Sequence, residues 1–285
     1  DRITNLIGQM TLEEKAGSMF ITMAAMNGDG SLSETQSIAN PFSFVVEGNT
    51  AMLLGKKMNH FNTIQSTSPE AMVVWHNNIQ KLVEGIGVGI PANNSSDPRH
   101  GANKDAEYNS GSGGTISQWP EELGLSATFD PAITLQFGAI ASKEYRALGI
   151  ATALSPQIDL ATEPRWNRFI GTFGEDPVLA TDMARAYVDG FQTSPQAIGS
   201  YNGWGNKSVN AMVKHWPSGG PEEGGRDAHF AYGKFAVYPG NNFQTHLKTF
   251  TEGAFKLTGG TKSASAVMPY YTISYNQDIK NNENV

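Results

Sequence analysis

Strand-like and helical segments alternate along the 285 residues of this chain, and this alternation is what most constrains its fold. Short apolar or β-branched runs are followed by longer stretches in which apolar residues recur every three or four positions. A strand followed by a helix, repeated several times, predicts a parallel sheet with helices outside it. The clearest strand candidates are Val88–Asp97, Ile150–Leu160, Val209–Trp216 and Ser263–Tyr271.

The helical stretches carry recognisable start signals. Thr11 and Glu14 have the spacing of a capping box at the start of the first helix. Ser68 is placed to act as an N-cap, with Pro69 in the first turn that follows. Helices are predicted at residues 10–20, 68–85, 129–149, 175–191 and 241–260.

Polar and charged residues gather at the C-terminal end of each strand candidate. Both α/β barrels and doubly wound sheets keep their sites at that edge. A barrel is favoured, because neither GIGVGI nor GSGGTI matches a dinucleotide fingerprint or a phosphate-binding loop. We count about six of the eight strand–helix units of such a fold. The sequence therefore predicts an α/β fold, a (β/α)8 TIM-type barrel that is incomplete at its C-terminus.

Composition narrows the classes of partner and cofactor. The net charge of −7 argues against a nucleic-acid partner, which would favour a basic face, and no apolar run approaches the roughly 18 residues of a membrane span. There is no cysteine and the six histidines lack ligand spacing, so neither a metal nor another cofactor is expected. Because the chain begins at Asp1 rather than Met, we expect a removed leader and a secreted or periplasmic protein, with a cytoplasmic one as the alternative.

Chemistry-bearing residues converge in the stretch Asn210–His229, NAMVKHWPSGGPEEGGRDAH. Lys214 and His215 at a strand end can fork around a small polar ligand, since the lysine offers three donors and the histidine one donor and one acceptor. Vicinal sugar hydroxyls suit such a fork, because each of them donates and accepts. The alternative, which these two residues alone favour, is an exposed lysine beside a packed histidine.

Three more strand ends offer similar alternatives. Asp97 precedes Pro98 and is held out of helical geometry, either as a ligand-binding carboxylate or as part of an ordinary turn. Arg165 stands beside Trp166. Either its guanidinium stacks on the indole ring, which would fix the direction of its donors, or it forms an interdomain ion pair. Tyr271 follows an apolar strand, where a tyrosine usually packs with its hydroxyl in water.

The order of these motifs is more specific than any one of them. The chain opens with Met-Thr-Leu-Glu-Glu-Lys and continues with Asp-Pro-Arg-His-Gly, Pro-Arg-Trp, Phe-Gly-Glu-Asp-Pro, Lys-His-Trp-Pro and Met-Pro-Tyr-Tyr. This series resembles the N-terminal barrel domain of glycoside hydrolase family 3, in its β-glucosidase and exo-β-glucanase branch. The resemblance implies a retaining β-glucosidase that releases terminal β-D-glucosyl residues from oligosaccharides or β-glucans.

The resemblance also assigns roles to individual residues. Asp97 corresponds to the aspartate that accepts hydrogen bonds from the distal hydroxyls of the sugar, and Arg165 to the arginine of the Pro-Arg-Trp motif. Lys214 and His215 correspond to the pair that grips the same ring, and Tyr271 to the tyrosine near the nucleophile. The expected partner is a β-linked oligosaccharide or glucoside.

The family's Ser/Thr-Asp-Trp motif does not occur in this chain, so no catalytic residue is expected in it. The Asp nucleophile is expected after Val285 and the acid/base farther on. Residues 1–285 are then the N-terminal part of the barrel domain, completed by a C-terminal segment or a companion chain. Arg226, Asp227 and His229 are expected to support the loop after the Lys-His pair.

Three alternatives stay open on the sequence. The first alternative is a sugar-binding remnant without catalysis, and the second is a family 3 enzyme of other specificity such as a β-xylosidase. An unrelated barrel with phosphorylated substrates is disfavoured by the negative net charge and by the lack of a glycine-rich phosphate loop.

Overall fold

The computed structural model describes residues 1–34, 46–63, 68–102, 116–194 and 203–277. The chain forms two compact units. Within the described ranges, unit 1 consists mainly of residues 1–99 and 145–152, and unit 2 mainly of residues 117–144 and 153–277. The boundary between the units runs through the helix α5 (Pro131–Ala147) and the short strand β4 (Thr152–Ala153).

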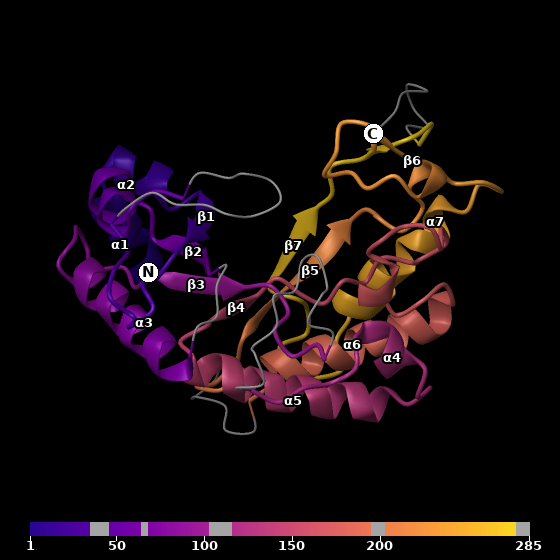
Figure 1. Cartoon of the computed structure of the whole chain (residues 1–285), viewed down its shortest axis with the longest axis horizontal. Coiled ribbons are helices and arrows are strands. Elements are labelled where there is room, and N and C mark those ends of the chain that lie inside the picture. Colours follow the sequence, from indigo (N-terminus) through magenta and orange to yellow (C-terminus); the bar gives the residue numbers. More distant parts are fainter. Residues whose placement is uncertain (35–45, 64–67, 103–115, 195–202, 278–285) are drawn as a thin grey trace. The chain divides into compact units, whose positions relative to one another are not determined.

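Unit 1 is built on three parallel strands, β1 (Ile21–Ala24), β2 (His60–Thr63) and β3 (Asn93–Ser96). Ile21 lies opposite His60, and His60 opposite Asn93. Its helices are α1 (Arg2–Gln9), α2 (Leu12–Gly17), α3 (Pro69–Glu84) and a π-helix at Ala51–Gly55. Helix α3, the long purple helix of Figure 1, buries Trp75 and Ile79.

The helix-start signals of unit 1 are confirmed. The side chain of Thr11 accepts the backbone N–H of Glu14, and the side chain of Glu14 accepts the backbone N–H of Thr11. The Ser68 side chain caps α3 by accepting the backbone N–H of Ala71, with Pro69 in the first turn. Helix α2 has six residues and is shorter than the helix predicted there.

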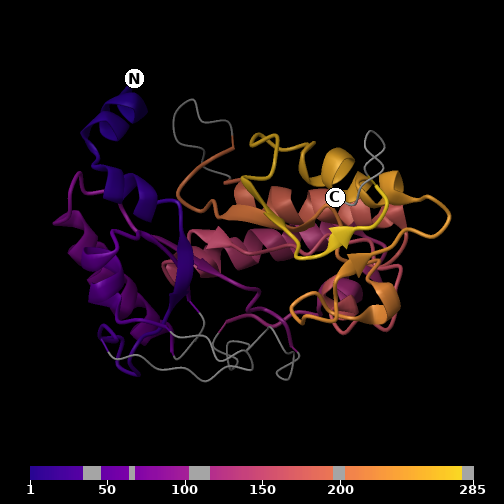
Figure 2. The ribbon, with the colours of Figure 1, turned by 90° about the horizontal axis from the view of Figure 1, so that it is seen from above.

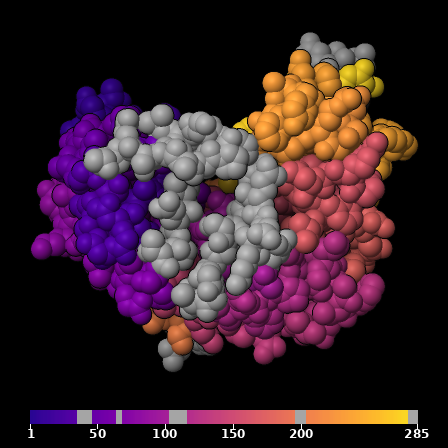
Figure 3. Space-filling model, viewed as in Figure 1, coloured from indigo at the N-terminus to yellow at the C-terminus, as the bar shows by residue number. Residues whose placement is uncertain are grey.

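Unit 2 contains the parallel pair β5 (Asn210–Trp216) and β7 (Ala266–Pro269), and a second parallel pair, β6 (Phe235–Ala236) and β8 (Ile273–Ser274). Its helices include α4 (Glu122–Ser126), α6 (Pro177–Gln192), α7 (Phe243–His246) and a π-helix at Thr249–Ala254. Helix α6 and this π-helix lie side by side (Figures 1 and 2). The segment that follows β5, drawn in orange, lies on the surface of the unit (Figure 3).

The strand order is β1-β2-β3-β4-β5-β7, and every pairing with a described register is parallel. A parallel series joined by helices confirms the predicted α/β class. Strand β5 also confirms the candidate at Val209–Trp216 almost residue for residue.

Other predicted elements are shorter in the structure. Strand β3 begins only at Asn93, after Pro91, and β4 ends at Ala153, before Pro156. A proline nitrogen has no hydrogen to donate to a strand ladder, which limits both strands. Residues 241–260 form α7 and the π-helix instead of one long α-helix.

Candidate functional site

Strand β5 carries Lys214 and His215 into the interior of unit 2. The strand is apolar from Ala211 to Val213, which is completely buried, and the lysine and histidine that follow are only 4% and 3% exposed. Burying a cation or an imidazole is costly unless polar partners replace water. The two side chains therefore need polar neighbours within the protein.

Asp159 is the main partner of His215. Its Oδ2 lies 2.8 Å from Nδ1 of His215, and its Oδ1 accepts the backbone N–H groups of His215 at 3.0 Å and of Gly219 at 2.6 Å. Burial by itself would raise the pKa of Asp159, but His215 and these two donors outweigh it and hold the pKa below its usual value. Asp159 is therefore an ionised anchor for the end of β5.

Arg168 occupies the other ring nitrogen of His215. Its Nη1 lies 3.0 Å from Nε2 of the imidazole. A guanidinium only donates, so Nε2 accepts and the ring proton sits on Nδ1, facing Asp159. Burial is the main cause that lowers the pKa of His215 to about 4; the charges of Arg168 and Lys214 add to it and Asp159 opposes it. His215 is held as a neutral ring in one tautomer.

Asp227 ties the loop after β5 to Trp166. Its Oδ2 accepts from Nε1 of Trp166 at 3.0 Å, and its Oδ1 lies 2.6 Å from Nδ1 of His229. Burial opposes ionisation, but the hydrogen bonds from His229 outweigh it and lower the pKa of Asp227 to about 2. Arg226 lies on the surface, 3.5 Å from the exposed Glu223. Of the three residues predicted to support this loop, Asp227 and His229 thus make internal contacts.

Glycines allow chain segments to approach one another closely here. A Cβ at Gly219 would lie 2.9 Å from a ring carbon of Tyr270 and 3.1 Å from Oδ1 of Asp159. A Cβ at Gly220 would lie 2.0 Å from the carbonyl oxygen of Leu160. These positions therefore require the absence of a side chain.

The two adjacent tyrosines after β7 have different surroundings. Tyr270 is buried, and its ring packs on His215 with centroids 4.4 Å apart. Tyr271, the tyrosine predicted to lie near the nucleophile, is 69% exposed, and its ring meets the ring of His229 edge-on with centroids 5.1 Å apart. Tyr270 is therefore the tyrosine in contact with the buried cluster.

The two arginines of Pro-Arg-Trp-Asn-Arg also differ. Arg165 pairs with Glu163 at 2.6 Å, and its side chain is 71% exposed. Arg168 is buried and reaches His215. The motif offers both arginines beside Trp166, and the sugar-binding role was predicted for Arg165 alone, with no role for Arg168. A substrate-binding role for Arg165 stays a prediction.

Two buried carboxyl groups were also missed. Glu122 begins α4 and Glu222 precedes a short helical turn; both side chains are inside unit 2. Burial is the main cause that raises the pKa of Glu122 to about 7 and that of Glu222 to about 8. Each has a glutamate beside it in the sequence, and nothing in the pattern shows which member of a pair points inward.

Asp97 belongs to unit 1 and follows β3 directly. Its Oδ2 accepts from Nδ2 of Asn62 at 3.1 Å, and its backbone carbonyl accepts from the hydroxyl of Tyr145 at 2.6 Å. These contacts hold it at the carboxyl end of β3, the position expected from the sequence. Its role toward a sugar stays a prediction.

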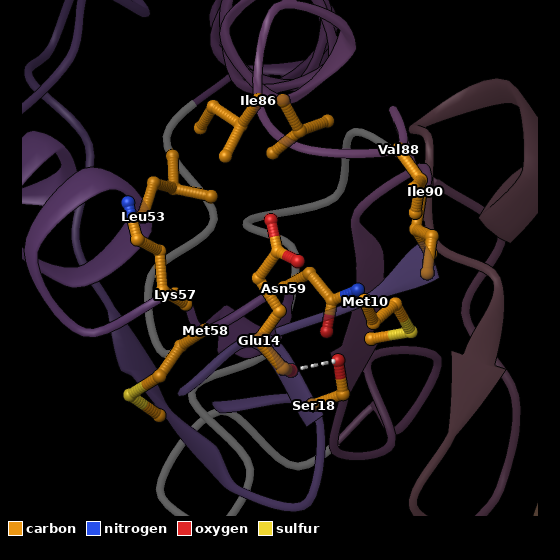
Figure 4. Close-up of a pocket in the computed structure, with 11 residues that line it drawn as sticks. Met10, Glu14, Ser18, Leu53, Lys57, Met58, Asn59, Ile86, Val88 and Ile90 are labelled. Carbon is orange, nitrogen blue, oxygen red and sulfur yellow. Dashed lines mark hydrogen bonds between the residues drawn. The ribbon is translucent and has the colours of Figure 1, made fainter. Parts of the chain in front are cut away.

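Unit 1 also contains a cavity of about 40 Å³, formed by segments that precede β1, β2 and β3 (Figure 4). Asn59 lines it, and the buried Oδ1 of this residue has no hydrogen-bond partner among the described residues. Apolar side chains such as Leu53, Ile86 and Ile90 form much of the wall. Sites of parallel α/β sheets lie at the carboxyl ends of strands, so this cavity at their amino ends is not the candidate site.

Within the described ranges, no three His, Asp or Glu side chains are grouped so that they could hold a metal ion. In the same ranges no helix has the length and apolar character needed to cross a membrane.

A parallel strand series with a buried polar cluster at the carboxyl end of β5 defines a barrel-type α/β domain of the kind that carries enzyme sites. The profile of the glycosyl hydrolase family 3 N terminal domain matches residues 50–260. The chain belongs to this family.

Similar proteins from a fungus and a bacterium support this membership. Beta-glucosidase C of Emericella nidulans is 41% identical over 278 residues, which cover 95% of this chain and 40% of the relative. A periplasmic beta-glucosidase/beta-xylosidase of Dickeya chrysanthemi is 40% identical over 277 residues, which cover 97% of this chain and 39% of the relative. The chain thus spans about 40% of the length of these relatives.

Solved structures agree on the fold. A mutant exo-1,3/1,4-beta-glucanase from a Pseudoalteromonas species matches with a TM-score of 0.69 at 18% identity, over 97% of this chain and 39% of that one. A beta-glucosidase from intestinal bacteria matches with a TM-score of 0.65 at 24% identity, over 95% of this chain and 29% of that one. The six parallel strands of the described residues are consistent with an incomplete (β/α)8 barrel, which confirms the predicted fold class.

Proposed function

We propose that this chain supplies the sugar-binding half of the active site of a retaining β-glucosidase. The observation that carries the proposal is the cluster at the end of β5, in which Lys214, Arg168, His215 and Asp159 are all buried. Relatives about 40% identical are named beta-glucosidases, which supports the substrate class.

The cluster is suited to hold an uncharged sugar. Lys214 and Arg168 are buried cationic donors, and charge-assisted hydrogen bonds to hydroxyl oxygens are stronger than neutral ones. Asp159 fixes the ring of His215 beside them before any substrate arrives. Donors held in place in this way orient the glycosidic bond without reorganising during the reaction.

Other residues take their proposed roles from the family. Asp97 accepts hydrogen bonds from distal hydroxyls of the sugar, and Tyr271 lies near the nucleophile. Arg168 is the arginine that we assign to the sugar on its geometry, while Arg165 is the one that the Pro-Arg-Trp motif selects.

Retention of configuration needs two carboxyl groups. One attacks the anomeric carbon to form a glycosyl-enzyme intermediate, and the other protonates the leaving oxygen and then activates water. We place both groups outside residues 1–285, in a C-terminal segment or companion chain. The work of this chain is then to bind the ring and to orient the bond that breaks.

A β-xylosidase is the second candidate, because the Dickeya chrysanthemi relative is named for both activities. A sugar-binding chain without catalysis is the third. The periplasmic location in that relative's name also supports a secreted or periplasmic protein.

The test uses the complete protein with p-nitrophenyl β-glucoside and β-xyloside, together with NMR detection of the first anomer released. The proposal expects the larger kcat/KM for the glucoside and the β-anomer as first product. A larger value for the xyloside selects the second candidate, and an α-anomer overturns retention. Binding of glucose without hydrolysis selects the third candidate.

A further inference from the structure

A second polar cluster in unit 2 has no part in the proposed sugar contacts. It consists of Glu222, Tyr270 and Asp227, which are 1%, 9% and 4% exposed. We propose that Glu222 is a positioning residue: its neutral carboxylic acid donates a hydrogen bond to the hydroxyl of Tyr270 and so holds that ring against His215. The inference rests on the proposed function, because it concerns the same sugar-binding cluster.

The hydrogen bonds around Tyr270 leave room for one more donor. The Tyr270 hydroxyl donates to Oδ2 of Asp227 at 3.4 Å, so its lone pairs are available to accept. The carboxyl group of Glu222 interacts with this hydroxyl, because each of the two groups shifts the pKa of the other. Its Oε1 accepts the backbone N–H of Ala228 at 3.2 Å, whereas its buried Oε2 has no partner among the described residues. If Oε2 of Glu222 carries a proton, it can donate that proton to the Tyr270 hydroxyl, and this buried oxygen then has a hydrogen-bond partner.

The two carboxyl groups beside Tyr270 are not equivalent. Asp227 accepts from Trp166 and His229 as well as from Tyr270, and is therefore stabilised as an anion. Glu222 has one backbone donor, and a second buried anion next to Asp227 would be repelled. The protons are then arranged in one direction, from Glu222 to Tyr270 and from Tyr270 to Asp227.

The charged surroundings favour this arrangement. Burial is the main cause that raises the pKa of Glu222 to about 8, and the charges of Asp227 and Asp159 add to it, whereas the hydrogen bonds with Tyr270 and with the backbone N–H of Ala228 oppose it. The titratable or charged groups that act on Glu222 and Tyr270 are Asp227, Asp159, His229 through its contact with Asp227, and Arg168. Glu222 therefore keeps its proton at neutral pH and loses it under mildly alkaline conditions.

Deprotonation has a consequence for the sugar-binding cluster. The ring of Tyr270 packs on His215 with centroids 4.4 Å apart, and the position of its hydroxyl fixes the ring. Once Glu222 is ionised, two carboxylates compete for one hydroxyl proton and repel each other. The support of His215 is lost, and sugar binding weakens.

The experiment measures kcat/KM of the complete protein for p-nitrophenyl β-glucoside from pH 5 to 10. The variants are Glu222→Gln, whose amide donates at every pH, Glu222→Leu, which cannot donate, and the exposed neighbour Glu223→Gln as control. The wild type is expected to lose activity with an alkaline midpoint near pH 8. Glu222→Gln should keep roughly half of the wild-type value at pH 6 and move the midpoint up by about one pH unit or more.

Glu222→Leu should lower kcat/KM at pH 6 by about fivefold or more, and Glu223→Gln should follow the wild type. If the wild type hydrolyses the glucoside and Glu222→Gln keeps the wild-type midpoint, the inference is overturned while the proposed function stands. A fully active Glu222→Leu overturns it as well.

If the wild type does not hydrolyse the glucoside, the proposed function is wrong. Urea denaturation then tests separately whether Glu222 is protonated in the folded protein. The folded protein holds a proton on Glu222 that the unfolded chain releases above its ordinary pKa. The stability of the wild type relative to Glu222→Gln should therefore fall as the pH rises from 5 to 8.5. A difference that is constant over this range overturns the inference.

Discussion

Asp159 and His215 are 56 residues apart in the sequence and form a buried contact of 2.8 Å between Oδ2 and Nδ1. The same carboxylate accepts the N–H of Gly219 at 2.6 Å. One side chain therefore fixes both the histidine at the end of β5 and the first turn of the loop that follows. The geometry of the whole candidate site depends on this pair.

Asp159→Asn is expected to disrupt the pair. An amide in place of the carboxylate leaves at least one buried donor without an acceptor, which costs about 1–3 kcal/mol. Asp182, exposed and paired with Arg185 at 2.7 Å, provides the matched control. Urea denaturation should show a larger loss for Asp159→Asn than for Asp182→Asn, with a lower kcat/KM in the former only. Equal losses would remove Asp159 from its anchoring role.

Stability is expected to fall as the pH is lowered from about 6.5 to 4. Burial lowers the pKa of His215 and of His246 to about 4, so the unfolded chain binds protons in this range that the folded chain does not. The free energy of unfolding, measured with urea at several pH values, should have a smaller slope in His246→Gln than in the wild type. An unchanged slope contradicts a buried neutral His246.

Replacing the two arginines of the Pro-Arg-Trp-Asn-Arg motif is expected to have unequal effects on kcat/KM. Arg168→Lys should lower kcat/KM for an aryl β-glucoside about tenfold, because a lysine cannot reproduce the guanidinium geometry beside His215. Arg165→Lys should have the smaller effect, since this side chain is exposed and paired with Glu163. A larger loss in Arg165→Lys would restore the assignment made from the motif.

Gly219→Ala is expected to strain the site. The added methyl group would lie 2.9 Å from the Tyr270 ring and 3.1 Å from Asp159, and overpacking of this kind costs about 1–3 kcal/mol. Gly28 has no heavy atom within 4 Å of such a Cβ and provides the control. Thermal denaturation should separate the two variants, and a Gly219→Ala protein as stable as Gly28→Ala would contradict the close approach.

The sequence predicts an element of the fold correctly where neighbouring residues determine it. The capping box of Thr11 and Glu14 acts within one turn, and it forms as predicted. The apolar run ending in Lys214 and His215 also became a strand with nearly the predicted bounds, because a buried parallel strand is apolar along its length.

Contacts over long sequence separations decided the rest. Arg168 and Arg165 are three residues apart, and no pattern shows which one turns inward. The carbonyl of Arg168 accepts from the side chain of Gln157, and its guanidinium meets a histidine 47 residues away. Glu222 is buried for the same kind of reason, since the loop after β5 folds back over Tyr270.

The most direct test of the account is the kcat/KM of the complete protein for p-nitrophenyl β-glucoside with and without the substitution His215→Ala, after near-UV circular dichroism has shown that both proteins are folded. We predict hydrolysis by the wild type and a loss of well over about tenfold in the variant, since a ring clamp acts in the transition state. An unchanged kcat/KM in the folded variant would place His215 outside the site and contradict the account.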